Sequence, residues 1–141
     1  MIRSAEAGDL PAILSQLPRL QAELGLALPF HSGAARSTLK ALQGNARGLI
    51  LVLDLHGVQG FLLGVAQPYA FAHILAAEEI AWWIAPSHRG PWAGAMLERF
   101  EAWAAAQGAR LIGLSHTGKS ASAMYRRRGY APAETKYFRE I

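Results

Sequence analysis

The chain has 141 residues, of which 52% are hydrophobic and 17% charged, and it contains no cysteine. This length fits one domain, residues 1–141, with a globular core, and the absence of cysteine excludes disulfides and thiolate metal sites. The formal net charge of +4 suits an anionic ligand but is modest for a nucleic-acid binder. No apolar run approaches the roughly 18 residues that span a membrane, and no signal-peptide core follows Met1, so we expect a soluble, cytoplasmic protein.

The N-terminal part predicts a short strand followed by two helices. The alternation in "MIRSA" is typical of a strand, and Asp9 is expected to cap the helix after it. Apolar residues then recur at helical spacing, at Leu10, Ile13, Leu14 and Leu17. We expect Pro18 to kink or end this helix, with "RLQAELG" as a second piece. Either Ser32 or Ser37 is available to cap a second helix over about residues 35–42.

Three strands are expected in the middle of the chain. The apolar run "LILVLDL", the turn signal His56-Gly57 and the run "VQGFLLGVAQ" predict a hairpin that Pro68 closes. A further long strand is expected from about Ile74 to Ile84, before Pro86.

From Trp92 the apolar spacing becomes that of a helix, which we expect to stop at Gly108. A strand in "ARLIGLSH", a helix in "KSASAMYRRR" that ends at Gly129, and a terminal strand pair around "YAPAETKYFREI" complete the chain. The expected fold is α+β, a mixed and mainly antiparallel central sheet of about six to seven strands with about four helices on both faces.

The stretch "APSHRGPWAG" lies between an expected strand and an expected helix. The N-terminus of a helix offers unpaired backbone N–H groups and a favourable dipole to an anion. Gly90 and Gly94 would let the backbone approach such a ligand closely. Glycines also serve turns for purely conformational reasons, so this stretch alone leaves both interpretations open.

Three segments, in order, resemble the Gcn5-related N-acetyltransferase (GNAT) family. The acyl-CoA loop of that family reads Arg/Gln-x-x-Gly-x-Gly/Ala, and "RGPWAG" matches it at Arg89 and Gly94. "AMYRRRGYAP" is similar to the family motif in which a helical tyrosine stands four residues before Gly-Phe or Gly-Tyr. "IRSAEAGDLPAI" is similar to the family's opening strand, polar turn and first helix. The chain looks most like small bacterial or phage members of unassigned substrate.

Three positions depart from the family pattern. Trp92 stands where the penultimate glycine of the loop belongs, and Pro91 beside it has no N–H to donate. Gly118 stands where many members have an asparagine that contacts the pantetheine arm. These departures bear on the affinity for coenzyme A more than on the fold.

The resemblance implies transfer of an acetyl group from acetyl-CoA to a primary amine of a small molecule or protein, by direct attack in a ternary complex. It implies that the co-substrate lies along the end of the long strand and the loop. The basic run Arg126–Arg128 at a helix C-terminus fits dipole complementation and a solvated surface, with a contact to the 3′-phosphate as the alternative. The residues concerned are Trp83, Ile84, Ala85, Arg89, Gly90, Trp92, Ala93, Gly94, Ala95 and Arg128. The alternative is a catalytically weak or inactive acyl-CoA-binding module.

Two side chains are the candidate catalytic groups. The resemblance implies that the Tyr125 hydroxyl protonates the departing thiolate, although its helical spacing also fits a core aromatic. Glu79 is the candidate base that removes the proton of the amine, with Glu78 or water as alternatives. Strand alternation would put Glu79 on one face with Ala81 and Trp83.

The resemblance also implies that a main-chain N–H of a bulged strand, here near Trp83 or Ile84, faces the thioester oxygen. No histidine or carboxylate cluster has ligand spacing, so no metal is expected. The candidate acceptor-binding residues are Phe30, His31, His116 and Tyr137. A nucleic-acid partner is not expected, and a homodimer is left open.

Overall fold

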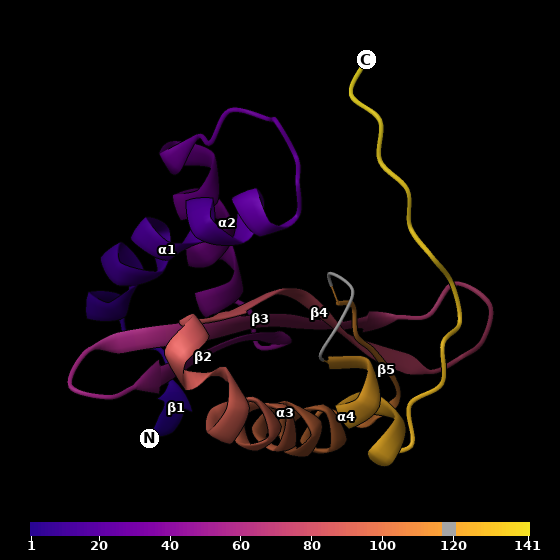
Figure 1. Ribbon diagram of the computed structural model, residues 1–141. Coiled ribbons are helices and arrows are strands. Elements are labelled where there is room, and N and C mark those ends of the chain that lie inside the picture. Colours follow the sequence, from indigo (N-terminus) through magenta and orange to yellow (C-terminus); the bar gives the residue numbers. More distant parts are fainter. Residues whose placement is uncertain (117–120) are drawn as a thin grey trace.

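The computed structural model describes residues 1–116 and 121–141. The strands are β1 (Ile2–Ser4), β2 (Gly48–Asp54), β3 (Val58–Pro68), β4 (Leu75–Ile84) and β5 (Ala109–Gly113). The helices are α1 (Leu10–Glu23), α2 (Ser32–Gln43), α3 (Arg89–Ala106) and α4 (Ala121–Arg127), with short 3-10 turns η1 (Ala7–Asp9) and η2 (Pro86–His88). In Figure 1 the sheet runs across the molecule, with α1 and α2 over one face and α3 and α4 over the other.

The sheet has five strands in the order β1-β2-β3-β4-β5. The first four are antiparallel neighbours, and β5 pairs with β4 in parallel after the crossover through α3. The expected mixed, mainly antiparallel sheet with helices on both faces is confirmed.

Two apolar clusters hold the layers together. On one face Ile13 and Leu39 of the first two helices pack on a set of sheet residues that includes Val52, Phe61 and Trp83. On the other face Met96, Leu97 and Phe100 of α3 and Tyr125 of α4 pack on residues that include Leu51, Leu62, Ala77 and Ile84. The alternation of β-strand side chains between the two faces therefore divides one sheet between two cores.

The predicted terminal strand pair is wrong. The segment from Tyr130 to Ile141 forms no strand; it is mostly exposed and runs along the outside of the molecule, past β5 (Figure 1). Its sequence lacks the run of alternating apolar residues that would give a strand a face to bury. The sheet consequently has fewer strands than expected.

Pro18 does not break the first helix, which continues from Leu10 to Glu23. Proline inside a helix costs about 3 kcal/mol. Leu17 and Leu20, on either side of Pro18, pack against the same cluster. Burying a large apolar side chain contributes about 1.5–3 kcal/mol, so burial on both sides offsets the lost hydrogen bond.

The cap of α2 also differs from the expectation. The helix begins at Ser32, and neither serine caps it: the Nδ1 atom of His31 accepts a hydrogen bond of 3.0 Å from the Ala34 N–H. His31 thus serves the first turn of α2. No helix in the described part of the chain is long and apolar enough to cross a membrane.

Candidate active site

The site begins where β4 and β5 part. Their parallel pairing runs from Leu75 with Ala109 to Glu78 with Gly113 and then stops, while β4 continues to Ile84. The backbone edge of β4 from Glu79 onward therefore has no strand beside it on the β5 side, among the described residues. Such an edge presents N–H and C=O groups to which an extended chain can add as a strand.

A β-bulge lies at the start of this open edge. Leu63 pairs with Ala81 and Gly64 with Glu79, so Ile80 is the extra residue on β4. The bulge was expected near Trp83 or Ile84, and that position is wrong. A bulge leaves one residue out of the ladder, and bulges are common beside active sites.

The bulge also changes which side chains share a face. Glu79 pairs with Gly64, where an added Cβ would lie only 2.6 Å from Cε2 of Phe100, so this pair faces α3. Ala81 and Trp83 instead pack in the cluster under α1 and α2. The expectation that Glu79 shares a face with them is wrong, because strict alternation holds only in a strand without an extra residue.

Glu79, Ser115 and Tyr125 are joined by hydrogen bonds. The Ser115 hydroxyl donates to Oε2 of Glu79 at 2.8 Å, and the Tyr125 hydroxyl donates to the Ser115 carbonyl oxygen at 2.8 Å. Burial raises the pKa of the Glu79 carboxyl, and hydrogen bonds from Ser115 partly oppose this. Burial, followed by the nearby Glu79 charge, also raises the pKa of Tyr125, so its phenol is protonated at neutral pH. The two predicted catalytic groups thus lie close together at the opening between β4 and β5.

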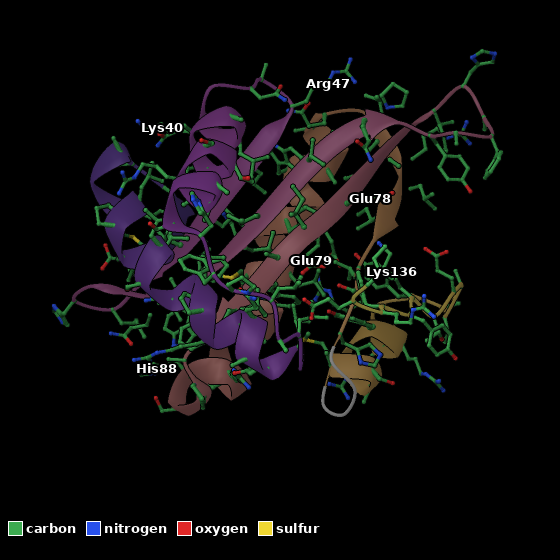
Figure 2. All side chains as sticks on the ribbon, turned by 90° about the horizontal axis from the view of Figure 1, so that it is seen from above. Lys40, Arg47, Glu78, Glu79, His88 and Lys136 are labelled. Atoms are coloured by element: carbon green, nitrogen blue, oxygen red, sulfur yellow. The ribbon has the colours of Figure 1, made fainter. Side chains whose placement is uncertain are left out.

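Aromatic rings surround Tyr125. Its ring stacks on Trp82 with centroids 6.4 Å apart, and His116 meets it edge-on at 5.9 Å. The residue is only 7% exposed and belongs to the α3 core. Tyr125 therefore fills both roles that the sequence left open, a core aromatic and a hydroxyl at the candidate site. In Figure 2 Glu78 and Glu79 lie along β4, with Glu78 nearer β5.

The expected anion loop is already helical. The sequence "RGPWAG" forms the first turns of α3, so the N–H groups of Ala93, Gly94 and Ala95 fall within the helical ladder. The Arg89 N–H donates to the Pro86 carbonyl. Pro91 has no N–H. Among the described residues, the Gly90 N–H is therefore the one first-turn donor of α3 that remains available to an anion. This cradle is smaller than the one the sequence predicted.

The side chains around the start of α3 are held by other parts of the protein. Trp92 is half-buried and packs against the α3 core, so its indole lies against the protein and does not point into solvent. Nε of Arg89 donates to the Ile84 carbonyl at 2.8 Å, and its guanidinium also pairs with Glu23 of α1. Glu23 in turn accepts a 3.0 Å hydrogen bond from the Trp83 indole. Arg89 thereby ties the end of β4 to α1.

Arg128, expected on the 3′-phosphate, is paired with a carboxylate. Its Nε and Nη2 atoms donate to Glu101 of α3 at 2.9 and 2.6 Å. The Tyr130 hydroxyl donates to the same carboxylate at 3.0 Å. These contacts join the end of α4 to α3, and they lower the pKa of Glu101. A phosphate would compete with Glu101 for Arg128.

An apolar groove lies on the opposite face, between α1 and α2. Its volume is about 270 Å³, and its lining includes Leu20, Phe30 and Leu39 together with Ile80 and Ala81 at the bulge. Among the expected acceptor residues, the structure brings Phe30 to this groove. His31 caps α2, His116 lies beside Tyr125, and Tyr137 is 88% exposed on the C-terminal segment. The acceptor residues expected together are therefore separated.

Several features of the site had no signal in the sequence. Ser115 follows an ordinary strand, and Glu23 ends an ordinary amphipathic helix, so neither spacing nor motif marks them. The described residues contain no group of three or more histidines or carboxylates that could hold a metal ion. Gly118, one of the departures from the family pattern, lies outside the described residues.

Comparison with known proteins agrees on the fold. No family model and no curated protein matches the sequence. Solved structures do match over the full chain, among them an aminoglycoside antibiotic 6′-N-acetyltransferase from Acinetobacter haemolyticus (TM-score 0.77, 16% identity, covering 100% of this chain and 97% of that one). A GNAT family acetyltransferase from Staphylococcus aureus gives a TM-score of 0.71 at 16% identity (100% and 98% covered). An acetyltransferase from Trypanosoma brucei gives 0.78 at 17% identity (100% and 99% covered). The chain thus has the fold of the GNAT acetyltransferases, as the sequence resemblance implied.

Proposed function

We propose that the protein is an acetyl-CoA-dependent N-acetyltransferase acting on a primary amine. The observation that carries this proposal is the opening between β4 and β5, where an unpaired strand edge, a bulge and the hydrogen-bonded Glu79, Ser115 and Tyr125 meet. The acetyltransferase fold of the neighbours supports it.

The residues present fit an acyl-coenzyme A in their donor chemistry. The pantetheine arm is an extended chain with amide groups, and the open edge of β4 beyond Glu78 offers the backbone groups to pair with it. The Gly90 N–H at the start of α3 offers a donor and the positive end of a helix dipole to the pyrophosphate. The contribution of the helix end is small, because Pro91 supplies no second donor.

Bound acetyl-CoA supplies a thioester: the amine lone pair forms the C–N bond, the C–S bond breaks, and the thiolate receives its electron pair and then a proton. The backbone N–H groups at the bulge around Ile80 are the candidate donors toward the thioester oxygen. Glu79 accepts the proton that the amine loses, directly or through water, and its raised pKa suits this role. Tyr125 donates its proton to the thiolate, and a proton from solvent restores the phenol, which then donates again to the Ser115 carbonyl.

A binding module without turnover is the second candidate, and the small cradle at Pro91 favours it. One pair of measurements separates the two. Acetyl-CoA at about a hundred times its Kd should stabilise the protein by about 2.7 kcal/mol in a thermal shift. Free coenzyme A should then appear only when an amine is added. Stabilisation without coenzyme A release across a broad amine panel would identify the binding module, and no stabilisation would refute both candidates.

A further inference from the structure

The groove between α1 and α2 is built almost wholly from apolar side chains. Leucines of both helices form its walls, Phe30 comes from the loop between them, and Ile80 and Ala81 bring it to the bulge of β4. Its only polar side chains among the described residues are Gln21 and Thr38. No charged side chain lines it there.

Each of these two side chains is already hydrogen-bonded to a backbone carbonyl, and they are the only side chains of the described lining that could accept hydrogen bonds from a ligand. Nε2 of Gln21 donates to the Leu28 carbonyl, and the Thr38 hydroxyl donates to the Ala34 carbonyl at 3.2 Å. A ligand that carried several hydroxyl or ammonium groups would lose its water here and find few replacement partners. The groove therefore disfavours polyhydroxylated and multiply charged molecules and accepts an apolar body.

The groove is open to solvent and has a volume of about 270 Å³. A short alkyl chain or a single aromatic ring with a two-carbon arm fits within it.

The groove lies next to the segment of β4 at which the acyl transfer is proposed. Ile80, the extra residue of the bulge, lines the groove on one face of the sheet, and its neighbour Glu79 faces α3 and Tyr125 on the other. The groove therefore ends at the same segment of β4 as the open strand edge, on the opposite face of the sheet from Glu79. A groove without a carboxylate also disfavours the ammonium form of a bound amine, so it favours the neutral nucleophile.

Resting on the proposed function, we infer that the acceptor is a small primary amine on an apolar body, seated in the groove between α1 and α2 with its nitrogen toward the bulge at Ile80. The lone pair of that nitrogen forms the new C–N bond to the acetyl carbon of acetyl-CoA. Its proton passes through water toward Glu79, because Glu79 lies on the other face of the sheet. The inference assigns a substrate class to the site and a specificity role to the lining of the groove.

The first test compares amines with the intact protein. Release of coenzyme A from acetyl-CoA is measured with 2-phenylethylamine, an amine on an apolar body, and with spermidine, a polycationic amine with a similar number of non-hydrogen atoms. We expect kcat/KM for 2-phenylethylamine to be at least tenfold higher. Equal or better use of spermidine would overturn the inference while leaving the proposed acetyltransferase function standing.

Variants of α2 locate the acceptor. Ala35 lines the groove, and Ala34 beside it is exposed and lies outside the lining. Ala35→Phe should raise KM for 2-phenylethylamine at least tenfold without changing KM for acetyl-CoA, and Ala34→Phe should change neither. Thr38→Asp, at an exposed position on the same wall, should shift the preference toward spermidine. Unchanged KM values in the correctly folded Ala35→Phe and Thr38→Asp variants would place the acceptor elsewhere and overturn the inference.

Binding of the amine to the groove can be measured independently of acetyl transfer. Methyl NMR signals of Ile80 and Leu20 should move on titration with 2-phenylethylamine, whereas that of Leu111, exposed on β5, should not. Binding at the groove without coenzyme A release would count against the proposed function alone. No shift at Ile80 and Leu20 would overturn the inference.

Discussion

Among the described residues the Tyr125 hydroxyl makes one hydrogen bond, and removing the hydroxyl separates a structural role from a catalytic one. Tyr125→Phe keeps the buried ring against Trp82 and deletes only the 2.8 Å bond to the Ser115 carbonyl. One neutral hydrogen bond contributes about 1 kcal/mol, which corresponds to a shift in Tm of about 3 °C for a domain of this size. If Tyr125 protonates the thiolate, kcat should fall by about 10²–10⁴, far more than this stability change explains.

Tyr130→Phe is the matched control. Tyr130 also donates one hydrogen bond, to Glu101 at 3.0 Å, and its ring lies 5.8 Å from that of Tyr125. The control should lose a similar amount of stability, measured by urea unfolding, and keep its rate of coenzyme A release. Acetyl-CoA binding should survive in both variants. A Tyr125→Phe protein with full kcat, or a Tyr130→Phe protein that loses as much activity, would refute the acid role.

Two further predictions concern the base and the coenzyme site. Burial raises the pKa of Glu79, so kcat/KM should rise as the pH passes this raised pKa. Glu79→Gln should lose this pH-dependent rise, and an unchanged pH profile would assign the base to another group. In urea unfolding, the stability contributed by the protonated carboxyl is fully present below the unfolded pKa, near the ordinary glutamate value of 4.5. It is lost as the pH rises through the folded pKa, and Glu79→Gln should show no such loss. Pro91→Ala restores an N–H to the first turn of α3 and should lower the Kd for acetyl-CoA severalfold, or by about 1 kcal/mol in binding free energy. The Kd is measured by calorimetry, and an unchanged value would show that the pyrophosphate does not lie at this helix end.

The start of α3 explains how Pro91 and Trp92 are accommodated. Proline suits the first turn of a helix because its N–H is not needed there, and Trp92 gains burial against the α3 core. Both residues thus stabilise the start of the helix, and Trp92 does so at the position where the resemblance would place a glycine.

The residues that ring the site also join its parts. Glu23 of α1 binds both Arg89 and the Trp83 indole, so the wall of the groove and the start of α3 are fastened to the same strand end. Glu101 binds Arg128 and Tyr130 and thereby keeps α4, with Tyr125, against α3. These ion pairs are partly exposed, and their contribution is mainly geometric.

The sequence by itself determined the strands from Ile2 to Ile84, the four helices and the layering, because periodicity of apolar residues reports which face each element buries. It also indicated Tyr125, through the motif resemblance, and Glu79, through its position on a strand, as the candidate catalytic residues. The terminal strands are missing because the segment from Tyr130 lacks the alternation of apolar residues that gives a strand a face to bury.

Only the tertiary structure decided how the site is assembled. The bulge at Ile80 depends on the register between β3 and β4, and one extra residue turns Glu79 to the face opposite Ala81 and Trp83. Ser115 enters the site because β5 ends beside β4, and the groove exists because α1 and α2 pack over the bulge. Register and helix packing arise from contacts between distant parts of the chain, and no local pattern of residues encodes them.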